Sequence, residues 1–204
     1  MISLNMKLTI LSNFDLNNDL NYPELFSHLS STGFYKADGL SENLKKIYPD
    51  IIYSSPFLSA LQTIYPTCKK YNKYINIDNS LCPPAKNIDY GLKSGEHLDI
   101  TTHYNYLTDV INTNYKSSLL INNIPYSETP IDITNRIYPF LFKIYNTYHL
   151  TNYNVCLVTH SSITKIIIDY FKEYKPHERE IEYLIINDKH YPDELYNINP
   201  LHTE

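Results

Sequence analysis

The chain has 204 residues, a net charge of −5 at neutral pH, and a hydrophobic fraction of 43%. This length suits a single domain over residues 1–204, large enough to bury a core without a disulfide or a metal. The acidic balance disfavours a phosphate-backbone partner, so we expect no nucleic-acid binding. No apolar run approaches the roughly 20 residues of a bilayer-spanning helix, so we expect no membrane partner.

The cysteines and the residue bias indicate where the protein works. The chain has three cysteines, Cys68, Cys82 and Cys156, an odd number with no CxxC spacing. This pattern disfavours a disulfide framework and a cysteine zinc site. The N-terminus has the pattern of a leading strand rather than of a signal peptide. We therefore expect a cytoplasmic protein. Abundant Asn, Ile, Lys and Tyr indicate an AT-rich genome, and for a viral source the expected location is the host cytoplasm or the virion.

The N-terminal third predicts two strands and a helix. A short apolar run at residues 8–11 predicts a buried strand, and the polar residues Ser12 and Asn13 begin the loop after it. Apolar residues at helical spacing over residues 37–47 predict a helix, which a Pro-Asp pair ends. A brief buried strand is expected at residues 51–53.

A second helix is expected directly after that strand. Ser55 is the expected N-cap and Pro56 the expected first helical residue. Pro66 lies within the helix and is expected to kink or shorten it. Residues 81–99 contain two prolines and two glycines, which predicts a long loop.

The C-terminal half continues the alternation of helices and strands. Apolar spacing predicts a helix through residues 133–144 with Pro139 inside it, then a strand at 155–159. A helix through residues 163–171 and a last strand at 181–186 follow. This order indicates an α/β domain with a largely parallel sheet.

Three of the predicted loops begin where a predicted strand ends. They start at Ser12, Ser54 and His160. Because ligands of parallel α/β sheets bind beyond the carboxyl ends of the strands, we expect these loops to converge on one site.

Three stretches match the motifs of a known family. Residues 50–63 contain IIYSSPFLSALQT, which is similar to IYSSPLxRAxQT; residues 29–37 contain LSSTG, which is similar to LTxxGxxQA. Residues 155–163 contain VCLVTHSSI, which is similar to VLVVSHGGV. Weaker similarities follow at residues 87–91 (EIDFG) and 127–140 (ES…R…PF). In this order and spacing the chain resembles the histidine phosphatase superfamily, the phosphoglycerate-mutase-like proteins.

The resemblance implies a three-layer α/β/α sandwich with a mixed, mainly parallel central sheet. It also implies a phosphate pocket at the strand ends, where a histidine attacks phosphorus, two arginines and a second histidine hold the phosphoryl oxygens, and a carboxylic acid protonates the leaving group. Each group answers a need of phosphoryl transfer: an in-line nucleophile, neutralised oxygens and a protonated leaving oxygen.

The sequence departs from this set of catalytic residues at nearly every position. Asn13 stands where the resemblance places the nucleophilic histidine, and Ser12 where it places the first arginine. Ser59 replaces the second arginine and Asn87 is the best match for the acid. Only His160 remains. No His or Arg occurs in the first 27 residues, so the loss of the nucleophile does not depend on the alignment.

The remaining residues of the expected pocket allow more than one interpretation. Phe14 stands in place of a glycine and either plugs the pocket or stacks on a ligand. His160 is either an anion ligand or general base, or a residue that shapes its loop. Several neutral side chains either bind an uncharged ligand such as a sugar, or cap helices and satisfy loop backbone. They are Ser12, Asn13, Ser54, Ser55, Ser59, Ser161 and Ser162.

Metal and cofactor binding have no support in the spacing of the chain. No HxxxH or similar ligand pattern occurs, so we expect neither a metal nor a cofactor, and we expect the available carboxylates to be solvated. These carboxylates are Asp15, Glu96, Asp99, Glu128 and Asp132.

The sequence therefore predicts a catalytically degenerate homologue, a pseudoenzyme that acts in binding or assembly. The alternative is an active phosphatase or hydrolase with a site rebuilt around His160. The expected partner is an unidentified protein or a weakly bound small molecule, and homodimerisation stays open.

Overall fold

The computed structural model describes residues 6–17, 24–44, 48–85, 105–125, 127–173, 182–186 and 197–198. Within them, one sheet has the strand order β3-β2-β4-β1-β5-β6. Neighbouring strands run parallel except β5 and β6, which are antiparallel. The strands are β1 (Lys7–Ser12), β2 (Ile51–Ser54), β3 (Ile75–Ile77), β4 (Asn154–Thr159), β5 (Glu182–Ile186) and β6 (Asn197–Ile198).

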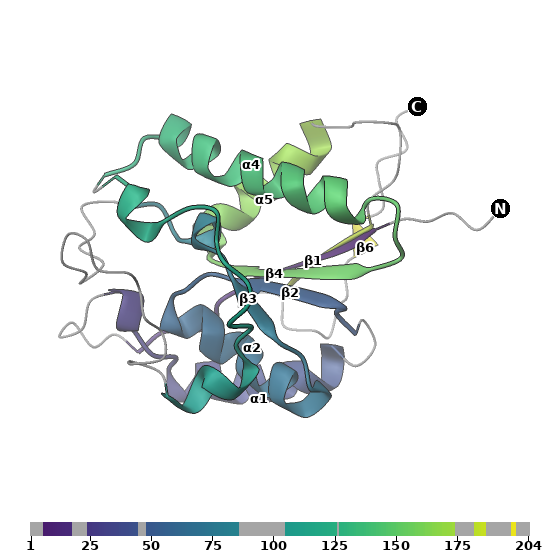
Figure 1. Ribbon diagram of the computed structural model, residues 1–204. Helices are drawn as coiled ribbons and strands as arrows, with labels where there is room; N and C mark the ends of the chain where they lie inside the picture. Colours follow the sequence, from purple (N-terminus) through teal and green to yellow (C-terminus); the bar gives the residue numbers. More distant parts are fainter. Residues whose placement is uncertain are drawn as a thin grey trace.

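Two helical layers enclose the sheet (Figure 1). One face carries α1 (Ser31–Asn43) and α2 (Leu58–Tyr71); the other carries α4 (Pro130–Tyr148) and α5 (Ser161–Glu173). The expected α/β/α sandwich with a mainly parallel sheet is therefore confirmed. Short 3-10 helices join the layers: η1 (Glu24–Phe26), η3 (Asn79–Leu81), η4 (Asn105–Val110) and η5 (Ile121–Asn123).

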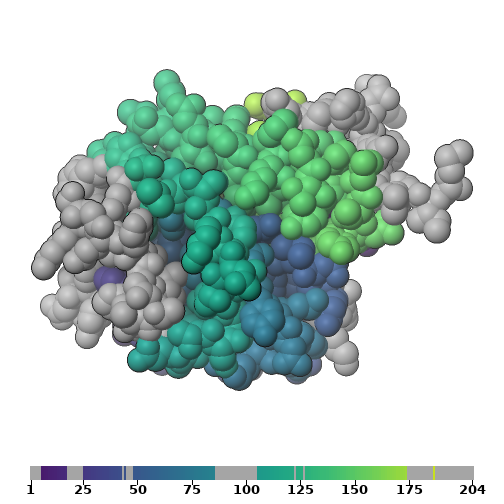
Figure 2. Space-filling model, in the orientation of Figure 1, coloured from purple at the N-terminus to yellow at the C-terminus, as the bar shows by residue number. Residues whose placement is uncertain are grey.

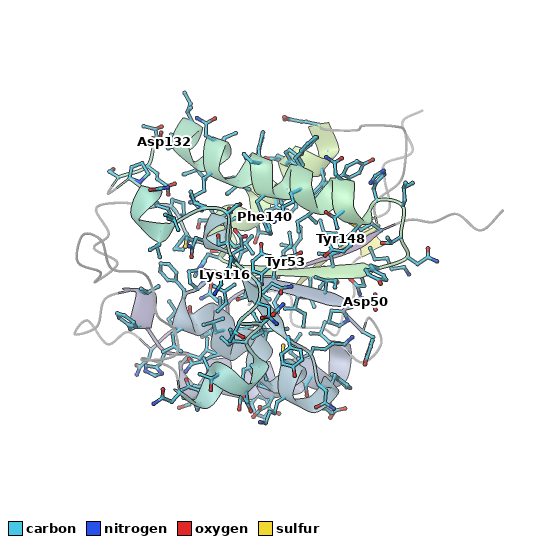
Figure 3. The ribbon with its side chains drawn as sticks, in the orientation of Figure 1. Asp50, Tyr53, Lys116, Asp132, Phe140 and Tyr148 are labelled. Carbon is cyan, nitrogen blue, oxygen red and sulfur yellow. The ribbon has the colours of Figure 1, made fainter. Side chains whose placement is uncertain are left out.

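The central strands are mainly apolar and almost fully buried because helices cover both faces of the sheet. Every residue of β4 is buried, and all of β1 except Lys7. One core cluster lies under α1 and α2, and a second under α4 and α5. In the second cluster, the rings of Tyr53 on β2 and Phe140 on α4 pack edge to face with their centroids 5.5 Å apart (Figure 3). This core fixes where the strand ends lie.

The helices begin and end at other residues than the sequence predicts. α1 begins at Ser31, six residues before Ala37, because the Ser30 hydroxyl caps it by accepting from the Gly33 amide. The predicted Ser55 cap for α2 is wrong: Phe57 is the N-cap residue. Pro66 does not shorten α2, which continues to Tyr71.

Two strands were not predicted from the sequence. β3 is a three-residue edge strand, and β6 follows the strand expected to be last. Residues 105–125 run along the β3 edge, where the Asn112 amide donates to the Ile75 carbonyl at 2.9 Å. Figure 2 shows this segment between the two helical layers. It covers backbone that an open sheet edge would leave unpaired.

The predicted loop at residues 81–99 lies outside the described residues from position 86 onward. Leu81 itself ends η3. Among the helices described, none has the length and apolar character that crossing a membrane requires.

Candidate functional site

The carboxyl ends of β1, β2 and β4 lie next to one another and bring the three predicted loops together. The Asn13 amide donates to the Thr159 carbonyl, and the Ser55 amide donates to the Val158 carbonyl, both at 2.9 Å. The chains that leave β1 and β2 are thus both hydrogen-bonded to the end of β4. We call Ser12, Asn13, Ser55, Ser59 and His160 the strand-end crevice, after the position beyond the strand ends at which parallel α/β sheets bind ligands; four of the five residues are buried.

His160 is the one ionisable side chain of the strand-end crevice. It is 9% exposed, and its Nε2 lies 3.0 Å from the Ser55 hydroxyl oxygen. The Phe57 ring packs against it edge to face at 5.0 Å. Burial, and secondarily the positive charge of Arg136, lower the His160 pKa to about 3. The imidazole is therefore neutral near pH 7 and offers no positive charge to an anion.

Ser54, the last residue of β2, and Ser55, which follows it, hydrogen-bond to local backbone groups. The Ser55 hydroxyl accepts from the Phe57 amide at 3.3 Å, and the Ser54 hydroxyl donates to the Ser55 carbonyl at 3.0 Å. Both residues are fully buried. These contacts correspond to the structural interpretation of the serines, in which they shape the turn between β2 and α2.

Phe14 is fully buried and belongs to the core cluster under α1 and α2. Its amide donates to the Thr63 hydroxyl at 3.2 Å, and that hydroxyl donates to the Ser59 carbonyl at 2.8 Å. Thr63 therefore ties the loop after β1 to the first turns of α2. Ser59 is only 2% exposed at this junction.

The other predicted site residues divide by exposure. Ser12 is buried at the end of β1, and Asn13 is half-buried, with its side-chain amide donating to the Phe14 carbonyl at 3.3 Å. Ser161 and Ser162 are exposed in the first turn of α5. Asn87, the predicted replacement for the acid, lies outside the described residues.

Gly33 lets α1 approach the loop that leaves β1. A Cβ atom at this position would lie 2.5 Å from the Asp15 carbonyl oxygen, which is too close for any side chain. The same carbonyl accepts from the Ser30 amide at 2.8 Å. Gly33, the glycine of the LSSTG motif, is therefore required for packing, because only a residue without a side chain lets the start of α1 lie against the loop after β1.

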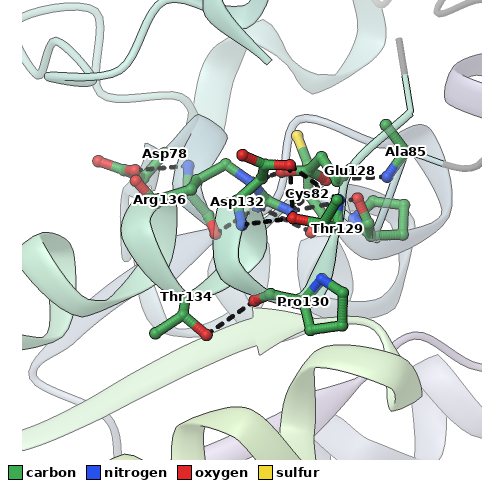
Figure 4. A network of polar contacts seen from close by, with 11 residues as sticks. Asp78, Cys82, Ala85, Glu128, Thr129, Pro130, Asp132, Thr134 and Arg136 are labelled. Atoms are coloured by element: carbon green, nitrogen blue, oxygen red, sulfur yellow. Dashed lines mark hydrogen bonds and ion pairs between the residues drawn. The ribbon is translucent and has the colours of Figure 1, made fainter. Parts of the chain in front are cut away.

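Arg136 on α4 lies near the crevice, but its hydrogen-bonding groups are occupied (Figure 4). Nε and Nη2 donate to the two Glu128 carboxylate oxygens at 2.7 and 2.9 Å. Nη1 donates to the carbonyls of Ser80 and Cys82, and Nη2 also donates to that of Pro83. A guanidinium has five N–H donors, and five acceptors surround this one. Arg136 therefore has no donor left for a phosphate.

The expectation that the carboxylates are solvated is wrong for Glu128, whose side chain is fully buried in the Arg136 ion pair. Asp132 accepts from the Thr129 amide and hydroxyl in a capping box that begins α4. Asp15 pairs with Lys36 at 2.7 Å. No group of three metal-ligating side chains occurs in the described parts of the chain. Two carboxylates, Glu96 and Asp99, lie outside them.

Asp78 is a buried polar residue outside the predicted site. Its side chain accepts from the Ser80 amide at 2.9 Å and from the Tyr115 hydroxyl at 2.5 Å. Burial and the Asp78 carboxylate raise the Tyr115 pKa. Asp78 thereby holds η3 and the segment that covers β3. Its position directly after the apolar pair of a short strand is the pattern that would have predicted an N-cap.

A mainly parallel α/β/α sandwich whose polar residues gather at the ends of β1, β2 and β4 has the architecture of the phosphoglycerate-mutase-like proteins. The family model of the histidine phosphatase superfamily (branch 1) matches residues 24–186. The chain belongs to this superfamily. No curated protein matches it.

Solved structures share the fold at low sequence identity. An ecdysone phosphate phosphatase from Bombix mori, in complex with tungstate, is 14% identical with a TM-score of 0.60, over 93% of this chain and 84% of its own. A mycobacterial glucosyl-3-phosphoglycerate phosphatase with inorganic phosphate is 17% identical, with a TM-score of 0.54, over 80% and 77%. A phosphoserine phosphatase mutant from Entamoeba histolytica, in complex with phosphoserine, is 16% identical, with a TM-score of 0.52, over 82% and 80%.

Proposed function

We propose that this chain is a catalytically degenerate histidine phosphatase homologue that acts in binding or assembly. The observation that carries the proposal is the neutrality of the strand-end crevice. Ser12, Asn13 and Ser59 carry no charge, and the pKa of His160, lowered to about 3, keeps its imidazole neutral. A transferring phosphoryl group spreads negative charge over its oxygens, so a catalyst must present cations to it.

Two further features support the proposal. Arg136, the cation beside His160, directs its five donors to Glu128 and to backbone carbonyls. Phe14 is buried in the core, next along the chain from Asn13, the position at which the superfamily's motif has a nucleophile. Losing one preorganised electrostatic donor costs about 10²–10³ in rate, and several are replaced together here.

The experiment is a phosphate-release assay on aryl phosphates with the full chain and its His160→Ala variant. We expect no turnover above the uncatalysed rate for either protein. Turnover that persists through further purification and disappears in His160→Ala would contradict the proposal. A melting curve for each protein separates lost folding from lost chemistry.

A second candidate function rests on the 3.0 Å contact between His160 Nε2 and the Ser55 hydroxyl, which has the geometry of a nucleophile and its base. Two observations weigh against a hydrolase built on it. Ser55 is fully buried, and a base with a pKa of about 3 is a poor acceptor for a hydroxyl proton.

A fluorophosphonate probe distinguishes the two candidates, because it labels an activated serine covalently. Under the pseudoenzyme proposal, mass spectrometry finds no adduct on Ser55. An adduct that is lost in both Ser55→Ala and His160→Ala would establish the hydrolase instead.

The proposed biological setting follows from composition and charge. We propose a cytoplasmic protein that binds a protein partner, including a second copy of itself, or binds a small molecule weakly. The net charge of −5 supports the proposal that nucleic acid is not a partner.

A further inference from the structure

A cavity of about 440 Å³ lies between α1, α2 and η4, and it shares no residue with the strand-end crevice. Its volume is within the range of small-molecule sites, about 300–1,000 Å³. Three aromatic rings line it, from Phe34 on α1, Tyr65 on α2 and Tyr106 on η4. α1 and α2 lie side by side on one face of the sheet (Figure 1), so both helices contribute walls.

The rings present π-faces and edges at a site that solvent reaches. Phe34 is 43% exposed and Tyr106 is 51% exposed, although both are large hydrophobic side chains. Tyr65 and Tyr106 meet edge to face, with centroids 6.2 Å apart and planes at 83°. An aromatic face is the negative end of the ring quadrupole, so a cation that meets the face of one of these rings would be attracted to it.

Gln62 at the base of the cavity holds Tyr106 in place. The Leu29 amide donates to Oε1 at 2.9 Å, which fixes which end of the side-chain amide faces each partner. Nε2 then donates to the Tyr106 hydroxyl at 2.7 Å and lies 3.0 Å from His28 Nδ1, which must act as the acceptor. Gln62 thus positions the aromatic wall before any ligand arrives.

The charges around the cavity leave one carboxylate uncompensated. Lys69 pairs with Asp109, and Lys70 pairs with Glu42. Asp38 lines the same cavity, and its carboxylate has no ion-pair partner among the residues that the structure describes. Asp38 is therefore the lining carboxylate that remains available to a cation, since Lys69 and Lys70, which also line the cavity, already pair with the carboxylates of Asp109 and Glu42.

We propose that this cavity binds an organic cation: a quaternary or alkylated ammonium group joined to an apolar or aromatic body. The rings of Phe34, Tyr65 and Tyr106 hold the cation and its apolar body, and Asp38 supplies the counter-charge. The proposal goes beyond the degenerate strand-end crevice and does not depend on it, because the two sites have no residue in common.

The test uses three probes that share a phenyl ring and differ in charge. Benzyltrimethylammonium, benzyl alcohol and phenylacetate are titrated separately into the full chain, with binding followed by two-dimensional NMR. We expect saturable shifts at cavity residues with the cation, weaker binding of the alcohol and weakest binding of the anion. Asp38→Asn and Tyr106→Leu should each weaken cation binding about fivefold, the size of a partly exposed cation–π or charge contact.

The matched control is Glu173→Gln, which removes an exposed carboxylate from α5 on the opposite face of the sheet and should leave cation binding unchanged. Equal affinity for benzyl alcohol and the cation would overturn the proposal, as would tightest binding of phenylacetate. Unchanged cation affinity in Asp38→Asn, with an unchanged melting temperature, would also overturn it. Phosphatase turnover elsewhere in the protein would contradict the proposed function and leave this result intact.

Discussion

Two polar regions of the molecule lie close together and have opposite character. The strand-end crevice, where the superfamily's motifs place catalytic cations, holds uncharged serine, asparagine and histidine side chains. The neighbouring cluster around Arg136, Glu128 and Asp78 holds charged groups that are buried and fully bonded. The difference shows that Arg136 serves the packing of α4 against η3, whereas the strand-end residues present no charge to a ligand at neutral pH.

Burial also has different consequences in the two regions. In the Arg136 cluster every donor meets an acceptor, so burial strengthens the contacts. In the crevice, burial keeps His160 neutral and places Phe14 in the core. The first region stabilises the fold, and the second presents no cation, which under the proposed function makes it a poor site for a charged phosphoryl group.

The largest expected effect is on the charged cluster. Arg136→Met removes five hydrogen bonds and leaves Glu128 buried without a counter-charge, so we expect a loss of about 3–5 kcal/mol in the free energy of unfolding. Urea denaturation measures it. The double variant Arg136→Met/Glu128→Leu should recover part of the loss because it removes the stranded carboxylate. A loss below about 1 kcal/mol in the single variant would show that the pair is solvated.

The next effect tests whether Phe14 is part of the core. Truncating a buried phenylalanine costs about 3–5 kcal/mol, and we expect Phe14→Ala to fall toward the lower end because the neighbouring loop can relax. Phe142→Ala is the matched control, since Phe142 is 48% exposed on α4 and should cost much less. Equal losses for the two variants in urea denaturation would place Phe14 at the surface.

A smaller effect concerns the pH dependence of stability. Burial lowers the His160 pKa to about 3, so the unfolded chain, with a histidine pKa near 6.5, binds the extra proton between these values. His160 therefore lowers stability as pH falls from about 6.5 toward 3, by up to about 1.4 kcal/mol per pH unit. In urea denaturation series, the free energy of unfolding, measured relative to each protein's value at pH 8, should fall less steeply for His160→Gln than for the wild type. Parallel curves would mean that His160 is protonated in the folded protein.

The smallest expected effect has the opposite sign. The Thr67 hydroxyl on α2 is buried and has no hydrogen-bond partner among the described residues. Thr67→Val keeps the shape and removes an unsatisfied group, so we expect a gain of up to about 1 kcal/mol in thermal or urea unfolding. Thr63→Val, one turn earlier, removes a hydroxyl bonded to Phe14 and Ser59 and should destabilise. Destabilisation by Thr67→Val would show that this hydroxyl has a partner.

The sequence predicts the central strands because burial on both faces leaves a mainly apolar run. Residues 8–11 and 155–159 have this pattern, and they became β1 and β4. β3 was missed because three residues at a sheet edge, with a half-buried Asn76 in the middle, carry no such run. The start of α1 was missed because its first turn is mostly exposed and polar, and only the Ser30 cap marks it.

The candidate site was less predictable than the fold because its properties depend on contacts between distant segments. The strand-end rule for parallel sheets correctly predicted that the loop at Ser54 meets the loop at His160, where Ser55 contacts His160, 105 positions along the chain. The sequence did not indicate that Glu128 is buried. Glu128 pairs with Arg136, and Arg136 is held in turn by carbonyls of residues 80–83, more than 50 positions away along the chain. Periodicity within one segment carries no information about such a contact.

The measurement that tests the central claim most directly is calorimetric titration of the full chain with inorganic phosphate at pH 7. The serine hydroxyls of Ser12 and Ser59 cannot make the paired charge-assisted hydrogen bonds with which arginine holds a phosphate. The neutral crevice therefore predicts no saturable binding below the millimolar range. Micromolar binding that is lost in His160→Ala, a variant whose folding the melting curve verifies, would contradict it and show that the crevice still holds a phosphoryl group.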